Sequence, residues 1–236
     1  SDNDYRQIKM NISNDKIYKI GNPRYDRILN NLENVEYKLD LSLKDEGNIL
    51  IFASMWDEDN KIIFEKFINS PLVNSFEKVI IVPHEVNDYY LNYYCSVLKD
   101  NDFSFKKINQ YQNFNQFEEK YIIINKVGFL SKLYAQSTIA YVGGGFSKSG
   151  IHNIIEPAAA SNPVIFGSNF LNSNKSDAEG LIDVSGGFSV DSYELFTEKI
   201  NWLLDKNNYN NSSKNCKTFV TENSGSTEKI LKELYE

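Results

Sequence analysis

Residues 141–157 read YVGGGFSKSGIHNIIEP, an apolar strand pattern that runs into three glycines, a loop of small residues and then a helical pattern. In open α/β sheets ligands bind at the carboxyl ends of the strands, where glycines let the backbone come close and the next helix offers free N–H groups. The stretch matches neither GxGxxG nor GxxxxGK[ST], which disfavours a dinucleotide fold or a P-loop and leaves a nucleotide monophosphate open. A bare glycine-rich turn is more often a simple strand-to-helix connection.

Short apolar runs rich in Ile, Val, Phe and Tyr recur along the chain. They occupy residues 17–20, 49–53, 79–82, 121–124, 138–142, 164–166 and 188–190. Continuously apolar strands suit a sheet that is buried on both faces, and helix-length segments separate most of them. The pattern therefore predicts an α/β fold, a Rossmann-like parallel sheet with helices on both faces and right-handed crossovers.

Helical patterns fill most of the intervals between these runs. We expect helices over residues 57–68, 85–99, 127–135, 151–160, 192–204 and 226–235, with a weak one over residues 4–10. The polar segments 109–119 and 207–213 are expected to be irregular. Because neither looks like a linker, we interpret residues 1–236 as a single domain.

Composition narrows the class of protein further. The chain has 236 residues, 41% of them hydrophobic, and a net charge of −7, which indicates a folded globular protein without a broad nucleic-acid grip. No apolar run reaches the roughly 18 residues of a membrane span, and the first residues lack a signal-peptide pattern. We therefore expect a soluble, cytosolic chain. With two cysteines and two histidines far apart, no structural metal site is expected.

Two polar residues follow the glycine loop on the expected helix. Asn153 and Glu156 are spaced i, i+3, so they share a helix face near the mouth of the loop, next to His152. A carboxylate there can accept hydrogen bonds from both hydroxyls of a ribose, and an amide both donates and accepts. The residues fit a plainer interpretation equally well, in which Glu156 complements the helix dipole and His152 makes an ordinary loop hydrogen bond.

Smaller features follow other strands. Arg24 lies in a turn after the first apolar run, Ser54 follows the second, His84 follows the third in Pro83-His84-Glu85, and Gly128 follows the fourth. Each alone is more often structural than functional. Their positions are more informative, because the carboxyl ends of parallel strands meet at one edge of a sheet.

The order of these motifs resembles a known family. The matching segments are Gly21-Asn-Pro-Arg-Tyr-Asp26, Ala53-Ser-Met-Trp-Asp-Glu58, Pro83-His-Glu85, Gly128-Phe-Leu-Ser-Lys-Leu-Tyr134, Gly143-Gly-Gly145, His152-Asn-Ile-Ile-Glu-Pro157 and Pro163-Val-Ile-Phe-Gly167. They resemble the C-terminal half of 3-deoxy-D-manno-octulosonic acid (Kdo) transferases, which are two-domain GT-B glycosyltransferases. The resemblance spans nearly the whole chain, and the run from Gly143 to Gly167 is its most specific part.

The resemblance implies a domain that binds the donor CMP-Kdo. The CMP contacts that it implies are Pro83, His84, Val127, Gly128, Phe129, Asn153, Ile154, Ile155 and Glu156. Nearby it places Arg24, Ser54, Gly143, Gly144, Gly145 and His152. The chain departs from the pattern at His84, where many relatives have Arg, and at Phe129, where many have Glu.

The resemblance also implies what lies outside this chain. In the family the catalytic base is a glutamate of an N-terminal acceptor domain, so we expect no catalytic residue here, no activity of this chain alone, and no cofactor or metal. The implied acceptor is a lipid A precursor of lipopolysaccharide biosynthesis, met at the cytoplasmic side of the inner membrane through the missing domain. Two alternatives are another GT-B enzyme that uses a UDP sugar, such as an epimerase or N-acetylglucosaminyl transferase, and a non-catalytic nucleotide-binding or interaction domain.

Overall fold

The described part of the chain is built around one parallel sheet. The computed structural model describes residues 6, 8–10, 17, 20–35, 48–110, 117–170 and 174–235. Within these ranges seven strands, all paired in parallel, lie in the order β3-β4-β2-β1-β5-β6-β7. The strands are β1 (Ile49–Met55), β2 (Lys78–Pro83), β3 (Phe105–Ile108), β4 (Tyr121–Ile124), β5 (Ile139–Val142), β6 (Val164–Gly167) and β7 (Gly187–Val190). The predicted parallel sheet is confirmed.

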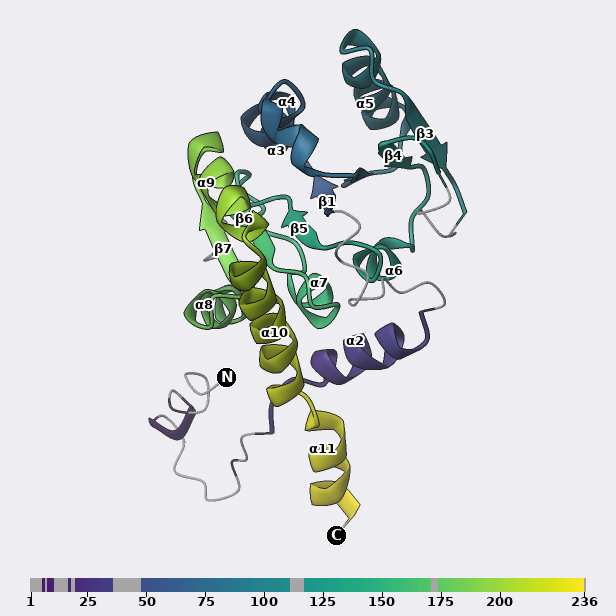
Figure 1. Ribbon diagram of the computed structural model, residues 1–236. Coiled ribbons are helices and arrows are strands. Elements are labelled where there is room, and N and C mark those ends of the chain that lie inside the picture. The colour runs from purple at the N-terminus through teal and green to yellow at the C-terminus, as the bar shows by residue number, and fades with distance from the viewer. Residues whose placement is uncertain are drawn as a thin grey trace.

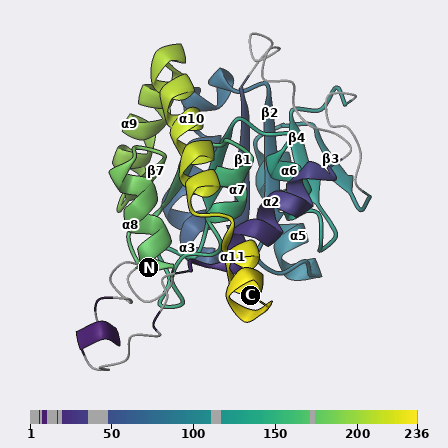
Figure 2. The same cartoon turned by 90° about the horizontal axis from the view of Figure 1, so that it is seen from below.

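Helices cover both faces of the sheet (Figure 1). On one face lie α3 (Asp57–Asp59), the π-helical turn η2 (Asn60–Phe64), α4 (Glu65–Ile68), the 3₁₀ turn η3 (Pro71–Ser75), α5 (Asp88–Asp100) and α9 (Tyr193–Leu204). On the other face lie α2 (Pro23–Glu33), α6 (Leu130–Tyr134), α7 (Ile155–Ala159), α8 (Lys175–Asp183), α10 (Lys206–Glu222) and α11 (Ser226–Tyr235). Seen from below, α2, α10 and α11 lie in front of the sheet (Figure 2).

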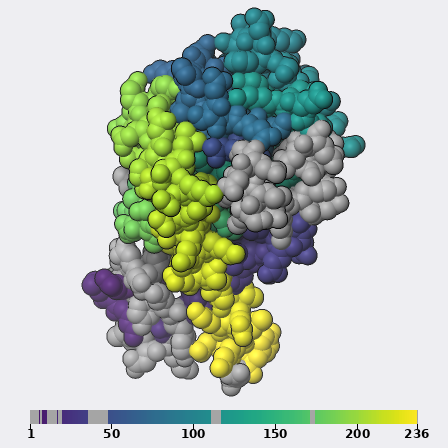
Figure 3. Space-filling model, in the orientation of Figure 1, coloured from purple at the N-terminus to yellow at the C-terminus, as the bar shows by residue number. Residues whose placement is uncertain are grey.

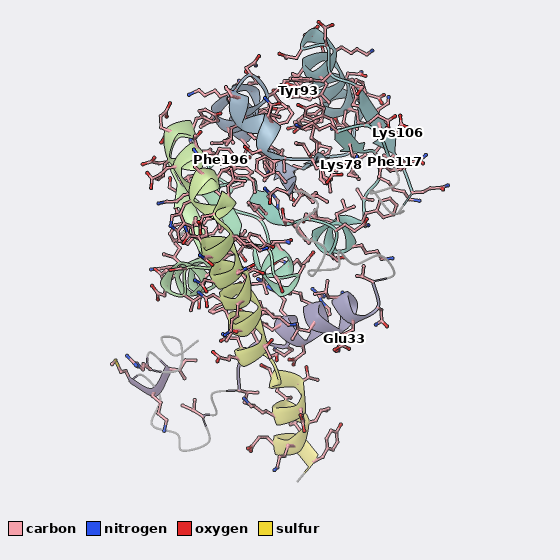
Figure 4. The ribbon with its side chains drawn as sticks, in the orientation of Figure 1. Glu33, Lys78, Tyr93, Lys106, Phe117 and Phe196 are labelled. Atoms are coloured by element: carbon pink, nitrogen blue, oxygen red, sulfur yellow. The ribbon has the colours of Figure 1, made fainter. Side chains whose placement is uncertain are left out.

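Alternate residues of each strand supply two cores. Leu50 and Phe52 of β1 pack under α4, α5 and α9, whereas Ile51 and Ala53 of the same strand pack on the opposite face. Phe196 of α9 and Tyr93 of α5 lie on the first side of the sheet and Glu33 of α2 lies on the other (Figure 4). Each fully buried aromatic or aliphatic side chain contributes about 1.5–3 kcal/mol relative to its exposed state, so both helix layers are held mainly by apolar burial.

The strand order has a switch point at its centre. From β1 the chain moves outward to β2, then to the β3–β4 pair, and afterwards returns to place β5 on the other side of β1. The neighbouring strands β1 and β5 form this switch point, because α3 and α4 follow β1 on one face and α7 follows β5 on the other. Connections that leave two neighbouring strands toward opposite faces open a crevice at their carboxyl ends, which is where ligands bind in such sheets.

The expectation that residues 207–213 are irregular is wrong, because they form the first part of α10. Asp205 caps this helix by accepting hydrogen bonds from the backbone N–H groups of Asn207 and Asn208, both at 3.0 Å. Tyr209 and Cys216, on its inner face, are buried against the rest of the protein. Capping and tertiary packing therefore offset the low helix propensity of the Asn- and Ser-rich sequence.

Other element predictions differ at the ends or in part. Residues 21–26, expected as a turn, begin α2, where Asn22 caps the helix and Pro23 takes its first position. The edge strand β3 and the helix α8 were not predicted, and β3 lacks an apolar run because Lys106 and Lys107 are exposed. In the strand predicted over residues 17–20, Ile17 and Ile20 are not in a strand, and residues 18–19 lie outside the described residues.

The predictions for the two chain ends and for the segment 109–119, expected to be irregular, have different outcomes. Arg6 and residues 8–10 are helical, while the rest of the predicted helix 4–10 lies outside the described residues, as do residues 111–116. The helix predicted over residues 226–235 is confirmed as α11. In the space-filling view the C-terminal residues, in yellow, form the lower end of the molecule (Figure 3).

The ends of β5 and β6 approach so closely that a side chain cannot fit between them. A Cβ atom added to Gly145 would lie 2.5 Å from Gly167 Cα. We expect Gly145→Ala to lower the free energy of unfolding by about 1–3 kcal/mol, because backbone atoms must shift to admit the methyl group. Urea unfolding measures the change, and Ser149→Ala, on an exposed residue of the same loop, is the matched control. Equal stability of the Gly145→Ala variant and the control would contradict the close approach.

Candidate functional site

A buried carboxylate holds the switch point together. Asp59 has no exposed surface. Its Oδ1 accepts a hydrogen bond from the Tyr141 hydroxyl at 2.6 Å, and its Oδ2 accepts from the backbone N–H groups of Gly144 at 2.9 Å and Trp56 at 3.0 Å. Asp59 thereby joins the end of β1 to the glycine loop after β5. Burial raises the pKa of Asp59, although these three hydrogen bonds act in the opposite direction.

The turn that follows Asp59 keeps polar side chains inside the protein. The five residues Asn60–Phe64 form a π-helical turn between α3 and α4, a rare feature found mostly near functional sites. Asn60 is buried, and its Oδ1 accepts a hydrogen bond from the Tyr94 hydroxyl at 2.8 Å. The sequence pattern did not single out Asp59, because it lies in an acidic stretch, residues 57–59, at the start of the helix predicted over residues 57–68.

The glycine loop lies against the end of β1. The Gly143 N–H donates to the Ala53 carbonyl at 2.8 Å, and a Cβ atom on Gly143 would collide with the Ser54 carbonyl oxygen. Ser54 itself has a φ of +54°, a conformation that L residues rarely adopt. The His152 N–H donates to the Gly143 carbonyl at 3.2 Å and so returns the loop to the same edge.

Three aromatic rings are stacked at this edge, which we call the ring stack: Trp56, His84 and His152. The rings of Trp56 and His84 lie 3.9 Å apart at 19°, and those of His84 and His152 lie 4.5 Å apart. Trp56 Nε1 donates a hydrogen bond to His152 Nε2 at 2.8 Å. Burial lowers the pKa of both histidines, and His84 lowers that of His152 further. Since Nε2 of His152 accepts a hydrogen bond, this imidazole is neutral and carries its proton on Nδ1.

A second polar network reaches the start of α7. Arg24 Nη2 lies 2.5 Å from Asp177 Oδ2 and donates to Asn153 Oδ1 at 3.3 Å. Asn153 Oδ1 also accepts from the Ile155 N–H, and Asn153 Nδ2 donates to Glu156 Oε1 at 2.7 Å. The guanidinium of Arg24 is therefore engaged by Asp177, a residue of α8 that sequence reasoning did not single out. This network fixes the orientation of the Asn153 amide and through it that of the Glu156 carboxylate.

Glu156 borders a small cavity. The cavity has a volume of about 170 Å³ and lies between α2, α6 and α7. Its lining residues are Arg27, Ile28, Asn31, Leu32, Ser131 and Glu156. Typical small-molecule sites have about 300–1,000 Å³, so this cavity accommodates only part of a nucleotide. Burial raises the pKa of Glu156, against the opposing effects of Asn153, Arg24 and Arg27.

The helix behind the glycine loop is shorter than predicted. It begins at Ile155 rather than Ile151, and residues 151–154 form an irregular turn. The side chains of Ile154 and Ile155 are fully buried in the core, so only their backbone groups can meet a ligand. Asn153 and Glu156 nevertheless touch, because the Asn153 side chain folds over the first turn of the helix.

The remaining predicted contacts lie just before α6 and at the end of β2. Val127 is 73% exposed, and Gly128 has a φ of +91° with open space around its Cβ position. Phe129 occupies the N-cap position of α6, whose Ser131 shares the cavity with Glu156. Pro83 is the buried last residue of β2 and delivers His84 to the ring stack.

The described residues contain neither a metal-binding cluster nor a membrane-spanning helix. No group of three or more His, Cys, Asp or Glu side chains in this part of the chain is arranged to hold a metal ion. None of the helices among the described residues has both the length and the apolar character needed to cross a membrane.

Sequence comparison connects the chain with curated glycosyltransferases. No family model matches it. It is 27% identical over 233 residues to a 3-deoxy-D-manno-octulosonic acid transferase of Chlamydia trachomatis serovar D, which covers 96% of this chain and 52% of the relative. It is 29% identical to the transferase of that name from Aquifex aeolicus over 163 residues, 69% of this chain and 43% of the relative. The resemblance to Kdo transferases is confirmed.

A further relative shows how much of such proteins the chain spans. It is 27% identical over 224 residues to a bifunctional glycosyltransferase/methyltransferase of Fusobacterium nucleatum, covering 92% of this chain and 33% of that protein. The chain thus spans about half or less of the length of these three relatives.

Solved structures share the fold. The C-terminal CMP-Kdo binding domain of WaaA from Acinetobacter baumannii matches with a TM-score of 0.62 at 16% identity, over 84% of this chain and 98% of that one. An α-glucosyltransferase solved with UDP and DNA matches with a TM-score of 0.55 at 12% identity, over 94% of this chain and 61% of that one. The predicted Rossmann-like α/β fold, a parallel sheet with helices on both faces, is confirmed.

Removing the Asp59 carboxylate should loosen the whole edge. Asp59→Ala leaves the Tyr141 hydroxyl and the N–H groups of Gly144 and Trp56 without their buried acceptor. We expect it to lower the free energy of unfolding by at least about 1–3 kcal/mol, measured by urea unfolding. Asp59→Asn should restore most of the stability, because its amide can accept from both N–H groups and donate to the tyrosine oxygen. If Asp59→Asn is as unstable as Asp59→Ala, the charge rather than the hydrogen bonding is required.

The raised pKa of Glu156 has a consequence for stability that depends on pH. Ionising this buried side chain opposes folding, so its unfavourable contribution is absent below the ordinary pKa of 4.5, grows between 4.5 and the raised folded-state pKa, and is complete above it. We therefore expect Glu156→Gln to gain stability relative to the wild type as the pH rises from about 4 to 8. Thermal unfolding across this range measures the difference. Glu222→Gln, at an exposed position of α10, is the control, and a pH-independent difference for Glu156→Gln would contradict the prediction.

Proposed function

We propose that this chain is the donor-binding domain of a glycosyltransferase, that the donor is CMP-Kdo, and that the sugar is passed to a lipid A precursor in lipopolysaccharide biosynthesis. The observation that carries the proposal is the oriented carboxylate of Glu156, which borders the small cavity near the switch point. The 27–29% identity to 3-deoxy-D-manno-octulosonic acid transferases and the fold shared with a CMP-Kdo binding domain support it.

In this proposal Glu156 recognises the ribose. Its Oε1 accepts one hydrogen bond from Asn153, which leaves further lone pairs of the carboxylate for the two ribose hydroxyls. A buried acid with a raised pKa opposes folding, and such groups are concentrated at functional sites. Ser131 borders the same cavity and supplies a hydroxyl beside the sugar.

The rest of the nucleotide extends over neighbouring backbone in this proposal. Val127, Gly128 and Phe129 meet the nucleotide from the start of α6, and the backbone groups of Ile154 and Ile155 meet it from the start of α7. Preorganised N–H donors stabilise the negative charge that develops on a departing CMP. Pro83 and His84 approach from the end of β2.

The reaction needs groups beyond those named here. We propose that the catalytic base, the acceptor site and any contact with the inner membrane belong to the part of the relatives that this chain does not match. The chain alone is then inactive. Orientation of the two reactants contributes about 7–11 kcal/mol to a reaction of this kind, and no acceptor is oriented by a donor domain alone.

Nucleotide binding tests the proposal directly. Glu156→Ala should weaken CMP binding by about ten- to a hundredfold, because charge-assisted hydrogen bonds contribute roughly 1.5–3 kcal/mol each. The wild type should bind 2′-deoxy-CMP more weakly than CMP, whereas the variant should barely distinguish the two. Calorimetric titration of both ligands into both proteins measures these differences. An unchanged CMP affinity in the Glu156→Ala variant would remove this residue from the site.

The same titration separates the alternatives. Selective binding of UDP over CMP would favour a UDP-sugar enzyme, the class suggested by structural neighbours solved with UDP, such as the α-glucosyltransferase. Failure to bind CMP, UMP or UDP would favour a non-catalytic interaction domain. Near-ultraviolet circular dichroism of each variant confirms that a lost affinity does not arise from unfolding.

A further inference from the structure

The ring stack brings His84 and His152 together at the crevice, and the two imidazole rings differ in their hydrogen bonds. His152 is held by two hydrogen bonds. Its backbone N–H donates to the Gly143 carbonyl, and its ring Nε2 accepts from Trp56 Nε1. Among the described residues, no hydrogen bond to either ring nitrogen of His84 is formed. His84 is half-buried and contacts Trp56 on one side.

The arrangement decides which histidine can become charged. Protonating His152 at Nε2 would break its hydrogen bond from Trp56 Nε1. Protonating His84 breaks no hydrogen bond, and it places a cation 3.9 Å from the face of an indole, which attracts cations. Two imidazolium rings 4.5 Å apart would repel each other, so the pair accepts one proton and His84 receives it.

Burial favours neutral rings in the free protein, against the acidic residues nearby. Glu85, next to His84, raises the pKa of His84, but burial outweighs it and lowers that pKa overall. His84 is the group that acts electrostatically on His152. Asp57 and Glu58 follow Trp56 on the neighbouring turn, Lys148 is exposed in the glycine loop, and Arg24 is engaged by Asp177.

We propose that His84 is an anion-binding group of the donor site, that it takes up a proton when the acidic group attached to the nucleotide binds, and that Trp56 is the positioning residue that directs the proton to it. The ligand chemistry is an oxyanion next to a nucleotide, either the phosphodiester or the carboxylate of the sugar. This inference rests on the proposed function, and it adds a role for Trp56 and a linkage of binding to protons.

Histidine titration by NMR tests the proton uptake directly. The chain has two histidines, so one variant, His152→Gln, assigns both imidazole signals. In the free protein both should titrate below the ordinary pKa of 6.5. With saturating cytidine 5′-methylphosphate, a diester whose own charge is fixed, the pKa of His84 should rise while His152 stays neutral. A His84 signal that does not move with any anionic ligand, or a His152 signal that moves instead, overturns the proposal.

Calorimetry in buffers of different ionisation enthalpy gives an independent readout. Near neutral pH the diester should bind with net proton uptake, and cytidine with none. Free Kdo provides the carboxylate arm, and uptake with Kdo but not with the diester assigns the site to the sugar carboxylate. Uptake with neither ligand overturns the proposal.

Variants separate this inference from the proposed function. His84→Gln should weaken diester binding about tenfold more than cytidine binding and abolish proton uptake, while Lys148→Ala should retain the uptake. Trp56→Phe keeps a ring beside His84 but cannot donate to His152, so the ligand-bound proton should divide between the two histidines in the NMR titration; an unaltered division shows that Trp56 does not direct it. If Glu156→Ala loses cytidine binding while His84→Gln keeps wild-type diester affinity and proton uptake, the anion site is contradicted and the proposed function is still supported. Failure of the wild type to bind cytidine or CMP would sink the proposed function itself.

Discussion

The carboxylate of Asp59 is the contact on which the geometry of this edge depends. It joins the turn after β1 to the strand β5 and the glycine loop, which lie 82 to 85 positions further along the chain. A buried acid is unfavourable unless its oxygens are paired, and here three donors pair them. Because each donor belongs to a different structural feature, the position of the glycine loop relative to Trp56 is set by one side chain.

The two polar networks divide the crevice into two functional regions. Around Glu156, side-chain hydrogen bonds lead from Asp177 through Arg24 and Asn153 to a carboxylate that borders a cavity. Around His84, aromatic stacking and one hydrogen bond leave a ring available for a proton. In the proposed function the first region binds the neutral hydroxyls of the ribose and the second binds an anion, the two chemical ends of a nucleotide linked to an acidic sugar.

In both regions burial makes the charged state of a titratable side chain unfavourable in the free protein. Burial raises the pKa of Glu156 and lowers that of each histidine, so each group is harder to charge than in water. A ligand that supplies the missing partner stabilises the charged state of the group. Part of the stability that the protein loses by burying the group is then recovered as binding free energy. The apolar cores on the two faces of the sheet supply the stability that lets the protein tolerate such groups.

Local sequence patterns were enough to predict most strands of the sheet, to place the glycine loop and to reveal the family resemblance. Continuous apolar runs such as residues 49–53 and 121–124 are decided by burial on both faces, which is a local property of composition. The exposed edge strand β3 and the polar helix α10 escaped this reasoning. For β3 the signal is weak because only one edge pairs, and for α10 the helix depends on the Asp205 cap and on packing by residues such as Cys216.

Only the tertiary structure decided which polar residues meet. The sequence placed Arg24, His84 and His152 at one edge, but not that Arg24 would be engaged by Asp177, or that Trp56 would donate to His152. It also gave no sign that Asp59 would be the acceptor for Gly144. Such contacts join residues that are 85 to 153 positions apart. Their partners depend on how the crossovers bring separate strand ends together, and a local pattern of residue types contains no information on that arrangement.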